Sequence, residues 1–236
     1  MPTSELNVKL LRYTINPEIV SATAAKLCYS NSKVDDLVQS ISKEDSNKLL
    51  NFIINSGHHS VLEHASFTFA IEGISRVCSH QLVRHRIASY SQQSQRYVNV
   101  GEFNYVLPPT IKNNPKALSE FNKAIKQATK SYVSLNKLVP KEDARFVLPN
   151  ACETKLVMTM NTRALYNFFE KRLCHRAQWE INALAHAMLK EVKKVAPILF
   201  EHIAEPCKMH GICKEGKMSC GLYKKFGGKL KQKPIL

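Results

Sequence analysis

The chain has 236 residues, 44% hydrophobic and 22% charged, which is typical of a soluble globular protein with a sizeable core. Lys and Arg number 34 against 19 Asp and Glu, a formal net charge of +15. This charge suits nucleic acid, an acidic membrane surface or nucleotides, and does not choose among them. No apolar run reaches the length of a membrane span and no signal-peptide pattern opens the chain, so we expect a cytoplasmic protein. The odd count of 7 cysteines favours reduced thiols over a closed disulfide framework.

The first predicted elements are a strand and two helices. Strand-forming residues with loose alternation predict a strand over residues 8–15. A helix is expected over residues 17–28, since proline is tolerated in a first turn. A second helix is expected over residues 45–56, with Gly57 ending it.

The next segment alternates cleanly between apolar and polar residues. Residues 65–72 therefore predict a half-buried strand, which Gly73 is expected to break. A helix over residues 74–86 should follow, and the polar stretch Ser89–Arg96 should leave it as a loop.

The second half is mainly helical. Apolar residues repeating at three and four positions predict a long amphipathic helix over residues 116–139. A short helix over residues 140–145 and a strand over residues 154–160 precede two more helices, over residues 162–174 and 177–195.

These elements mix without a regular βαβ rhythm, and no G-x-G-x-x-G follows a strand. We therefore expect an α+β (mixed α/β) fold, with a central sheet packed against long helices and no Rossmann unit. One domain over residues 1–205 and a Cys- and Lys-rich tail over residues 206–236 are expected.

The stretch Gln81–Tyr97 concentrates polar chemistry. It contains three arginines, one histidine, four glutamines and three serines. Arginine offers planar donors suited to phosphate or carboxylate, and amides and hydroxyls can recognise a uracil edge or a ribose. A solvated basic loop is the alternative for an arbitrary R-H-R tripeptide, but the recurrence of these groups over one stretch favours a binding site.

The same stretch resembles the R-H-R-x7-S motif of the flavin-dependent thymidylate synthases, from Arg84-His85-Arg86 to Ser94. The resemblance extends from about residue 20 to about residue 200. It includes G-H-x-[ST]-x-x-E-H at residues 57–64, A-R-x-x-L-P around Arg145 and N-x-R-x-x-x-N at residues 161–167.

The resemblance implies reductive methylation of dUMP to dTMP in a homotetramer with shared sites. FAD, methylene-tetrahydrofolate and NADPH are the implied cofactor and co-substrates, and no enzyme nucleophile is needed. Implied dUMP contacts are Gln81, Arg84, Gln92, Gln93, Ser94, Gln95, Arg96, Arg145 and Arg172. Implied FAD contacts are Ser60, Arg84, His85, Arg86, Gln92, Asn161, Arg163 and Asn167. Arg172 would stabilise the ring anion as the catalytic group, and His58 would lie near the reaction centre.

The sequence departs from the family pattern at three positions. Gln92 stands where glutamate is frequent, Gln95 replaces a frequent glycine, and Arg176 replaces a histidine of some members. Gln92 removes a possible carboxylate acceptor from that contact.

Two clusters raise the question of metal. The histidines at 58, 59 and 64 lack the i, i+4 spacing of a helical zinc pair, so no metal is expected there. In the tail, Cys207, His210, Cys213 and Cys220 could bind zinc, but free thiols are the expectation. Cys174 and His175 could contribute if the tail folds back.

Two rival functions remain open at this point. A nucleic-acid-binding module could use Arg84, Arg86 and the lysine-rich tail to contact phosphates, and would then show steep salt dependence. A zinc-dependent nucleotide enzyme centred on the tail would lose its activity on chelation.

Overall fold

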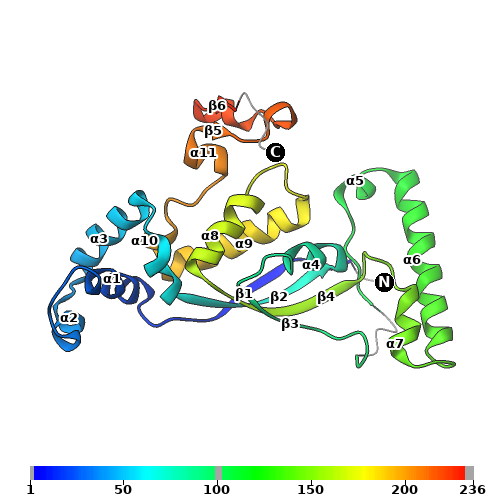
Figure 1. The fold of residues 1–236 in the computed structure, drawn as a ribbon. Helices are drawn as coiled ribbons and strands as arrows, with labels where there is room; N and C mark the ends of the chain where they lie inside the picture. The colour runs from blue at the N-terminus through cyan, green and yellow to red at the C-terminus, as the bar shows by residue number, and fades with distance from the viewer. Residues whose placement is uncertain (1–2, 99–102, 232–236) are drawn as a thin grey trace. The chain divides into compact units, whose positions relative to one another are not determined.

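The computed structural model describes residues 3–98 and 103–231 (Figure 1). The predicted tail is thus described as far as Lys231. The strands are β1 Asn7–Tyr13, β2 Ser66–Ser75, β3 Ser89–Gln92, β4 Glu153–Asn161, β5 Ile212–Cys213 and β6 Lys229–Leu230. The helices are α1 Pro17–Leu27, α2 Val34–Ser40, α3 Lys43–Ser56, α4 Arg76–Leu82, α5 Pro109–Lys112, α6 Pro115–Leu135, α7 Lys141–Ala144, α8 Thr162–Arg172, α9 Trp179–Val195, α10 Pro197–Phe200 and α11 Pro206–His210. Short 3-10 turns are η1 His59–His64, η2 Arg145–Val147, η3 Gly216–Met218 and η4 Leu222–Phe226.

Four strands form one sheet in the order β1-β2-β4-β3. The Asn7 side chain bonds to Glu72 at 2.7 Å, and the backbone of Thr14 bonds to Ser66 at 3.0 Å. Residue numbers rise along β1 while those of their partners fall along β2, so the two strands run antiparallel. The contacts of β2 with β4 follow the same rule. The prediction of a mixed fold with helices around a sheet is confirmed.

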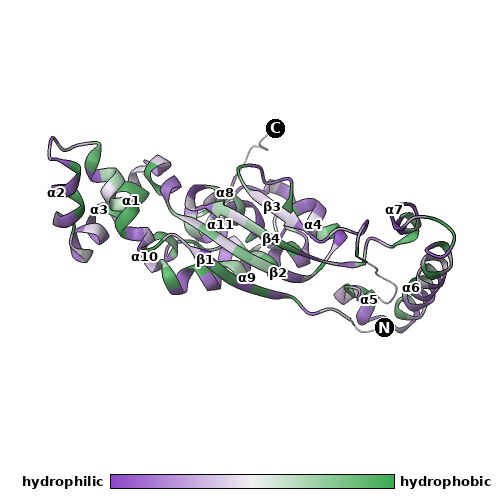
Figure 2. Cartoon of the chain, turned by 90° about the horizontal axis from the view of Figure 1, so that it is seen from below, coloured by the Kyte–Doolittle hydropathy of each residue, from purple (hydrophilic) through white to green (hydrophobic). Residues whose placement is uncertain are grey.

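The chain forms two compact units, and the boundary between them runs through all four strands. The first unit contains the described residues of 1–7, 70–84 and 90–157. Its core gathers Phe103, Tyr105, Ile125 and Cys152, with Phe121 of α6 packed against them. The long helix α6 has hydrophobic and hydrophilic residues on different faces, so that it covers this core with one face only (Figure 2).

The second unit contains residues 8–69, 85–89 and the described part of 158–236. Its helices α1 and α3 pack together, and η1 lies against both α1 and α8. The aromatic rings of Phe67, Phe169 and Phe200 meet edge to face at centroid distances of 5.3 and 6.1 Å. This buried cluster fixes the base of α8.

Most predicted elements are present. The predicted helices at 17–28, 45–56, 116–139, 162–174 and 177–195 and the strands at 8–15, 65–72 and 154–160 correspond to α1, α3, α6, α8, α9, β1, β2 and β4. Helix α3 ends as expected at Gly57, which has a φ of 75°. Among the described helices, none combines the length and apolarity required to cross a lipid bilayer.

Two predictions around the R-H-R motif are wrong. Strand β2 passes through Gly73 and ends at Ser75, so that α4 is confined to Arg76–Leu82 and leaves Arg84 beyond its end. Gly73 has a φ of 74°, and a Cβ built there would lie 1.8 Å from the carbonyl oxygen of Glu5. Only glycine permits this close approach without breaking the strand.

The stretch Ser89–Arg96 is also not entirely a loop, since residues 89–92 form strand β3. Pairing with β4 explains this difference: Gln93 donates its backbone N–H to the carbonyl of Lys155 at 2.9 Å. Long-range pairing outweighs the low strand tendency of this polar sequence.

Candidate active site

Helix α8 presents polar side chains on one face and packs with the other. The Asn161 side-chain oxygen caps the helix by accepting from the N–H of Ala164 at 2.8 Å. Arg163 and Asn167, four residues apart, are exposed, whereas Leu165, Phe168 and Phe169 are fully buried. Packing therefore fixes the helix and leaves these two polar groups accessible.

The central contact of the second unit joins the R-H-R motif to the end of α8. Arg172 donates its Nε–H to Nε2 of His85 at 2.9 Å, across 87 residues of sequence. The His85 ring also meets Phe168 edge to face at 5.0 Å. Accepting a hydrogen bond at Nε2 requires a neutral imidazole with its proton on Nδ1.

The electrostatics of the site favour this neutral form. Burial, followed by the nearby charges of Arg172 and Lys171, lowers the pKa of His85 to about 4. The imidazole is therefore an orienting acceptor for Arg172 at neutral pH. The arrangement holds the guanidinium in one plane without neutralising its charge.

A second group fixes Arg172 through its backbone. The Asn182 side chain on α9 donates to the carbonyl of Arg172 at 2.7 Å and to that of Cys174 at 3.3 Å. It thereby satisfies carbonyls that a helix end leaves without partners. Sequence reasoning missed Asn182, because its only signal was a polar residue near the start of α9.

The G-H-x-S segment, residues 57–60, leads from the end of α3 into η1. His58 and Ser60 are exposed, and Glu63 forms an ion pair with Arg163 of α8. His59 instead packs its ring against Tyr166 at 5.6 Å. The segment is thus held against α8 by the ion pair of Glu63 and by the packing of His59 on Tyr166.

The first unit gathers cations around one carboxylate. Glu142 of α7 accepts from Arg96 Nε at 2.8 Å and Nη2 at 2.7 Å, and its backbone carbonyl accepts from Arg145 Nε at 3.0 Å. Lys141 donates to the carbonyl of Tyr97 at 3.3 Å. Two of the predicted phosphate-binding arginines are therefore neighbours, although 49 positions separate them. Glu142 and Lys141 were missed, because they resemble ordinary residues of a charged helix start.

Two glutamines of this stretch form hydrogen bonds with residues at or just before the beginning of β4. Gln92 donates to the hydroxyl of Thr154 at 2.9 Å, and Gln95 donates to the Cys152 sulfur at 3.7 Å. Ser94 accepts from the backbone N–H of Arg96 at 3.2 Å. Gln92 and Gln95 thus form hydrogen bonds within the protein. Gln81 and Gln93 are both half-buried nearby.

The turn after α4 exposes Arg84 and Arg86. It continues into Ile87, which is 80% exposed and has a φ of 62°, a left-handed conformation unusual for a β-branched residue. Such strain costs of the order of 1–2 kcal/mol and is common at functional sites.

The thiols of Cys78 and Cys152 are not suited to nucleophilic attack. Cys152 is fully buried, and burial raises the pKa of its thiol to about 11. At neutral pH its thiolate fraction is about one in ten thousand. Cys78 is also fully buried.

Comparisons with known proteins find relatives that match most of the chain. A family model described as "Thymidylate synthase complementing protein" matches residues 9–198. A protein of Clostridium tetani named flavin-dependent thymidylate synthase is 50% identical over 236 residues, which cover 93% of this chain and 94% of the relative. One of the same name from Geobacter sulfurreducens is 52% identical over 219 residues, covering 92% and 94%.

A solved structure shares the fold. It is the UMP/dUMP methylase PolB from Streptomyces cacaoi bound with 5-Br dUMP, with a TM-score of 0.74 and 24% identity, covering 84% of this chain and 94% of that one. The fold, the motif from Arg84 to Ser94 and the extent of these matches lead to one conclusion: the chain belongs to the flavin-dependent thymidylate synthase family.

Proposed function

We propose that this chain converts dUMP to dTMP by reductive methylation, with methylene-tetrahydrofolate as the carbon donor and NADPH as the reductant of bound FAD. Membership of the family supports the reaction. The contact between Arg172 and His85 is the single observation that carries the mechanism. The nucleic-acid-binding alternative gains no support from the matches.

Methylation at C5 of a uracil requires electron density at that carbon. Because the Cys152 thiol is not suited to attack the pyrimidine, we infer that positive charge raises the electron density at C5. Arg172, oriented by the neutral His85, would stabilise the negative charge that develops on the pyrimidine when N3 loses its proton. Preorganisation by His85 and Asn182 means that little reorganisation is needed when this charge appears.

The nucleotide phosphate would bind in the first unit. Glu142 is surrounded by Arg96, Arg145 and Lys141. Its carboxylate accepts hydrogen bonds from the Arg96 guanidinium, as a phosphate oxygen would. Arg84 would add a further cation, and Gln81, Gln93 and Ser94 neutral hydrogen bonds.

The donor set of the second unit fits a flavin dinucleotide. Arg86, Arg163 and Asn167 are exposed, and Ser60 lies on the η1 segment that packs on α8. Asn161 uses its oxygen for the helix cap, which leaves the amide NH2 for a flavin acceptor. His85 would donate from Nδ1, and His58 would lie beside the reacting atoms. When bound, FAD supplies the hydride chemistry, and these residues position it.

We further propose a homotetramer whose sites combine residues of different subunits. The exposure of Arg86, Arg163 and Asn167 in a single chain supports it. Light scattering coupled to gel filtration would report a mass about four times that of the 26.7 kDa chain, and a monomer would contradict the assembly.

The function is tested with the purified protein. We expect a flavin spectrum in the visible range, and dTMP formation that requires dUMP, NADPH and methylene-tetrahydrofolate together. Arg172→Ala should lower the rate about 100-fold or more while flavin stays bound. Arg12→Ala removes an exposed arginine of β1 whose Nη1 donates to the carbonyl of Leu11; it is the control, and its rate should be unchanged. A colourless protein that takes up no FAD would refute the proposal.

A further inference from the structure

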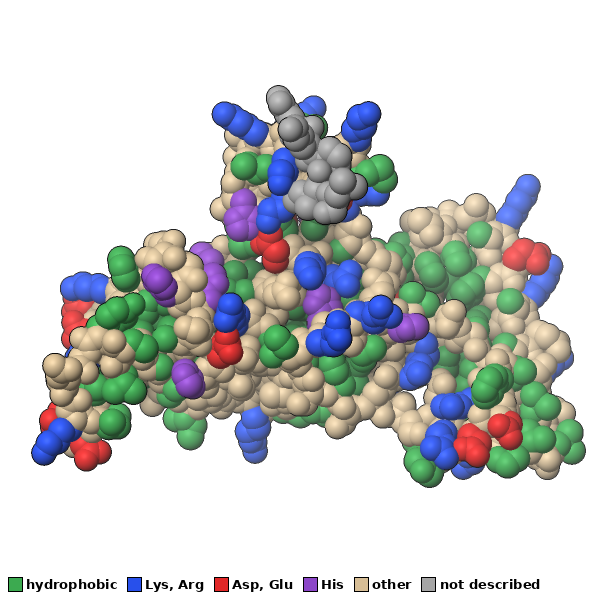
Figure 3. Space-filling view, in the orientation of Figure 1, with side chains coloured by type: hydrophobic (Ala, Val, Ile, Leu, Met, Phe, Trp, Pro, Cys, Tyr) green, Lys and Arg blue, Asp and Glu red, His purple; other side chains and the backbone are tan. Residues whose placement is uncertain are grey.

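The C-terminal segment, residues 206–231, folds with almost no apolar core. It forms α11, β5, β6, η3 and η4, and β5 pairs with β6 in parallel. Cys213 is its only buried residue. Lys and Arg side chains project from it (Figure 3). A module this small and this polar usually requires a cross-link or a metal to hold its structure.

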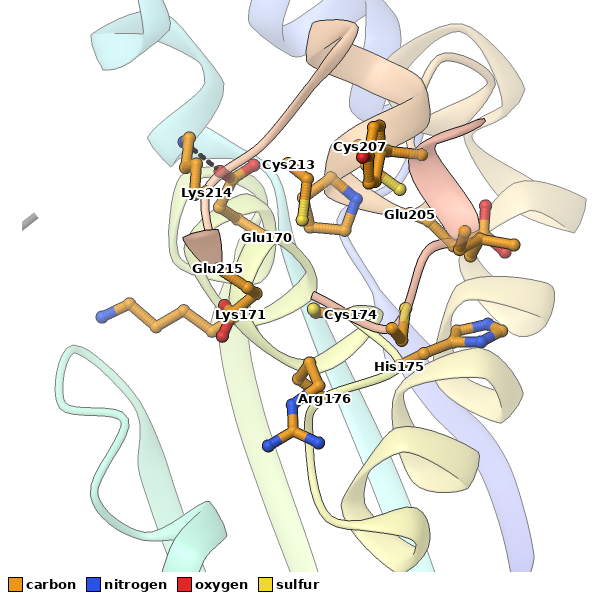
Figure 4. A pocket seen from close by; sticks show the side chains of 14 residues that line it. Glu170, Lys171, Cys174, His175, Arg176, Glu205, Cys207, Cys213, Lys214 and Glu215 are labelled. Carbon is orange, nitrogen blue, oxygen red and sulfur yellow. Dashed lines mark hydrogen bonds and ion pairs between the residues drawn. The ribbon is translucent and has the colours of Figure 1, made fainter. Parts of the chain in front are cut away.

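Four cysteines surround one cavity between this segment and α8. The cavity has a volume of about 330 Å³ and is lined by Cys174, Cys207, Cys213 and Cys220. Figure 4 shows the side chains of Cys174, Cys207 and Cys213 directed into the same space. The four thiols come from three parts of the segment and from the end of α8, so folding alone has brought them together.

None of these four cysteines forms a disulfide bond, so all four thiols are free to bind a metal.

We propose that Cys174, Cys207, Cys213 and Cys220 bind one Zn²⁺ that holds the C-terminal segment against α8. Four thiolates are the commonest soft ligand set for a structural zinc, and the spacing C-x5-C-x6-C supplies three of them from one short segment.

The site has to contract to bind the metal. As the side chains stand, no group of three or more His, Cys, Asp or Glu in the described part of the chain is arranged to hold a metal ion. Structural zinc sites often complete their geometry only when metal binds, because binding and folding are coupled. Cys220 is exposed and lies outside regular secondary structure, between η3 and η4, so its thiol can move at low cost.

His210 is excluded from this ligand set. Its Nε2 pairs with Glu170 of α8 at 2.7 Å, and it does not line the cavity. Lys214 donates to the same carboxylate at 2.6 Å. These contacts already place the segment beside Cys174. The sequence-based set of three cysteines and His210 is therefore replaced by four cysteines.

Metal analysis of the full-length protein tests the proposal. Protein purified without chelators should contain about one zinc per chain, and reaction of all thiols with a mercurial should release it. Exchange with Co²⁺ should give thiolate-to-cobalt charge-transfer bands and the strong d–d bands of four-coordinate cobalt. These measurements require neither flavin turnover nor the proposed function.

Variants assign the ligands. Cys174→Ser and Cys213→Ser should each lose the zinc, whereas His210→Ala and Cys28→Ser should retain it. Cys28 lies at the end of α1 and is the matched control. Bound flavin and circular dichroism show whether each variant folds. If a variant does not fold, the zinc content of the wild-type protein still tests the proposal. Protein without zinc that takes up neither zinc nor cobalt, or four thiols found paired as disulfides, would overturn the proposal. Loss of zinc from His210→Ala with retention in Cys174→Ser would do the same.

Discussion

The imidazole of His85 should remain uncharged until the pH falls to about 4. Its usual pKa is 6.5, and burial together with Arg172 and Lys171 disfavours the proton. A charged ring could not accept the Arg172 hydrogen bond. The orientation of that guanidinium therefore depends on the neutral form.

The sign of the effect on stability follows from the lowered pKa. Above about pH 6.5 the ring is neutral in both folded and unfolded chains, so this group's contribution to folding is fully present. As the pH falls from 6.5 towards 4, the unfolded chain takes up the proton first, and stability is lost. For a fully buried ring, this difference between the folded and unfolded pKa would correspond to about 3 kcal/mol of stability. Because His85 is only half-buried, screening by water reduces this contribution to about 1 kcal/mol.

NMR of the imidazole C–H signals, with His85→Gln to assign the resonance, measures this pKa directly. Urea unfolding of wild type and His85→Gln at pH 7.5 and 5 measures the free energy of unfolding. The wild type should lose about 1 kcal/mol more than the variant on acidification. A His85 resonance that titrates at pH 6.5 or above would refute the neutral-acceptor role. His85→Gln keeps an acceptor and should retain more activity than His85→Ala.

The remaining predictions concern the first unit and the glycines. Glu142→Gln removes the carboxylate that pairs with Arg96, so calorimetry should show dUMP binding several-fold more tightly. The free energy of unfolding should change by less than about 1 kcal/mol, because the ion pair is half-exposed. Weaker dUMP binding would mean that Glu142 positions the arginine. Gly73→Ala should destabilise by more than about 2 kcal/mol in urea unfolding, since its Cβ meets the Glu5 backbone. Gly57→Ala has a similar φ but open space, and should cost only about 1 kcal/mol; equal losses would show that the close approach is unimportant.

The amino-acid sequence by itself determined the family, the long helices and most of the candidate residues. Motif spacing such as that from Arg84 to Ser94 is local, and so is the helical periodicity of residues 116–139. Caps and stops, such as Gly57 after α3, also depend only on neighbours in the chain. These features can be predicted because their physical causes lie within a few residues.

Only the tertiary structure decided which of these residues act together. The pairing of Arg172 with His85 spans 87 positions, and that of Arg96 with Glu142 spans 46. Strand β3 exists because β4 supplies its hydrogen bonds, and Cys174 joins the tail thiols only because residues 206–231 fold back on α8. Hydrogen bonds and charges act through space over a few ångströms, so contacts between distant segments leave no local pattern in the sequence.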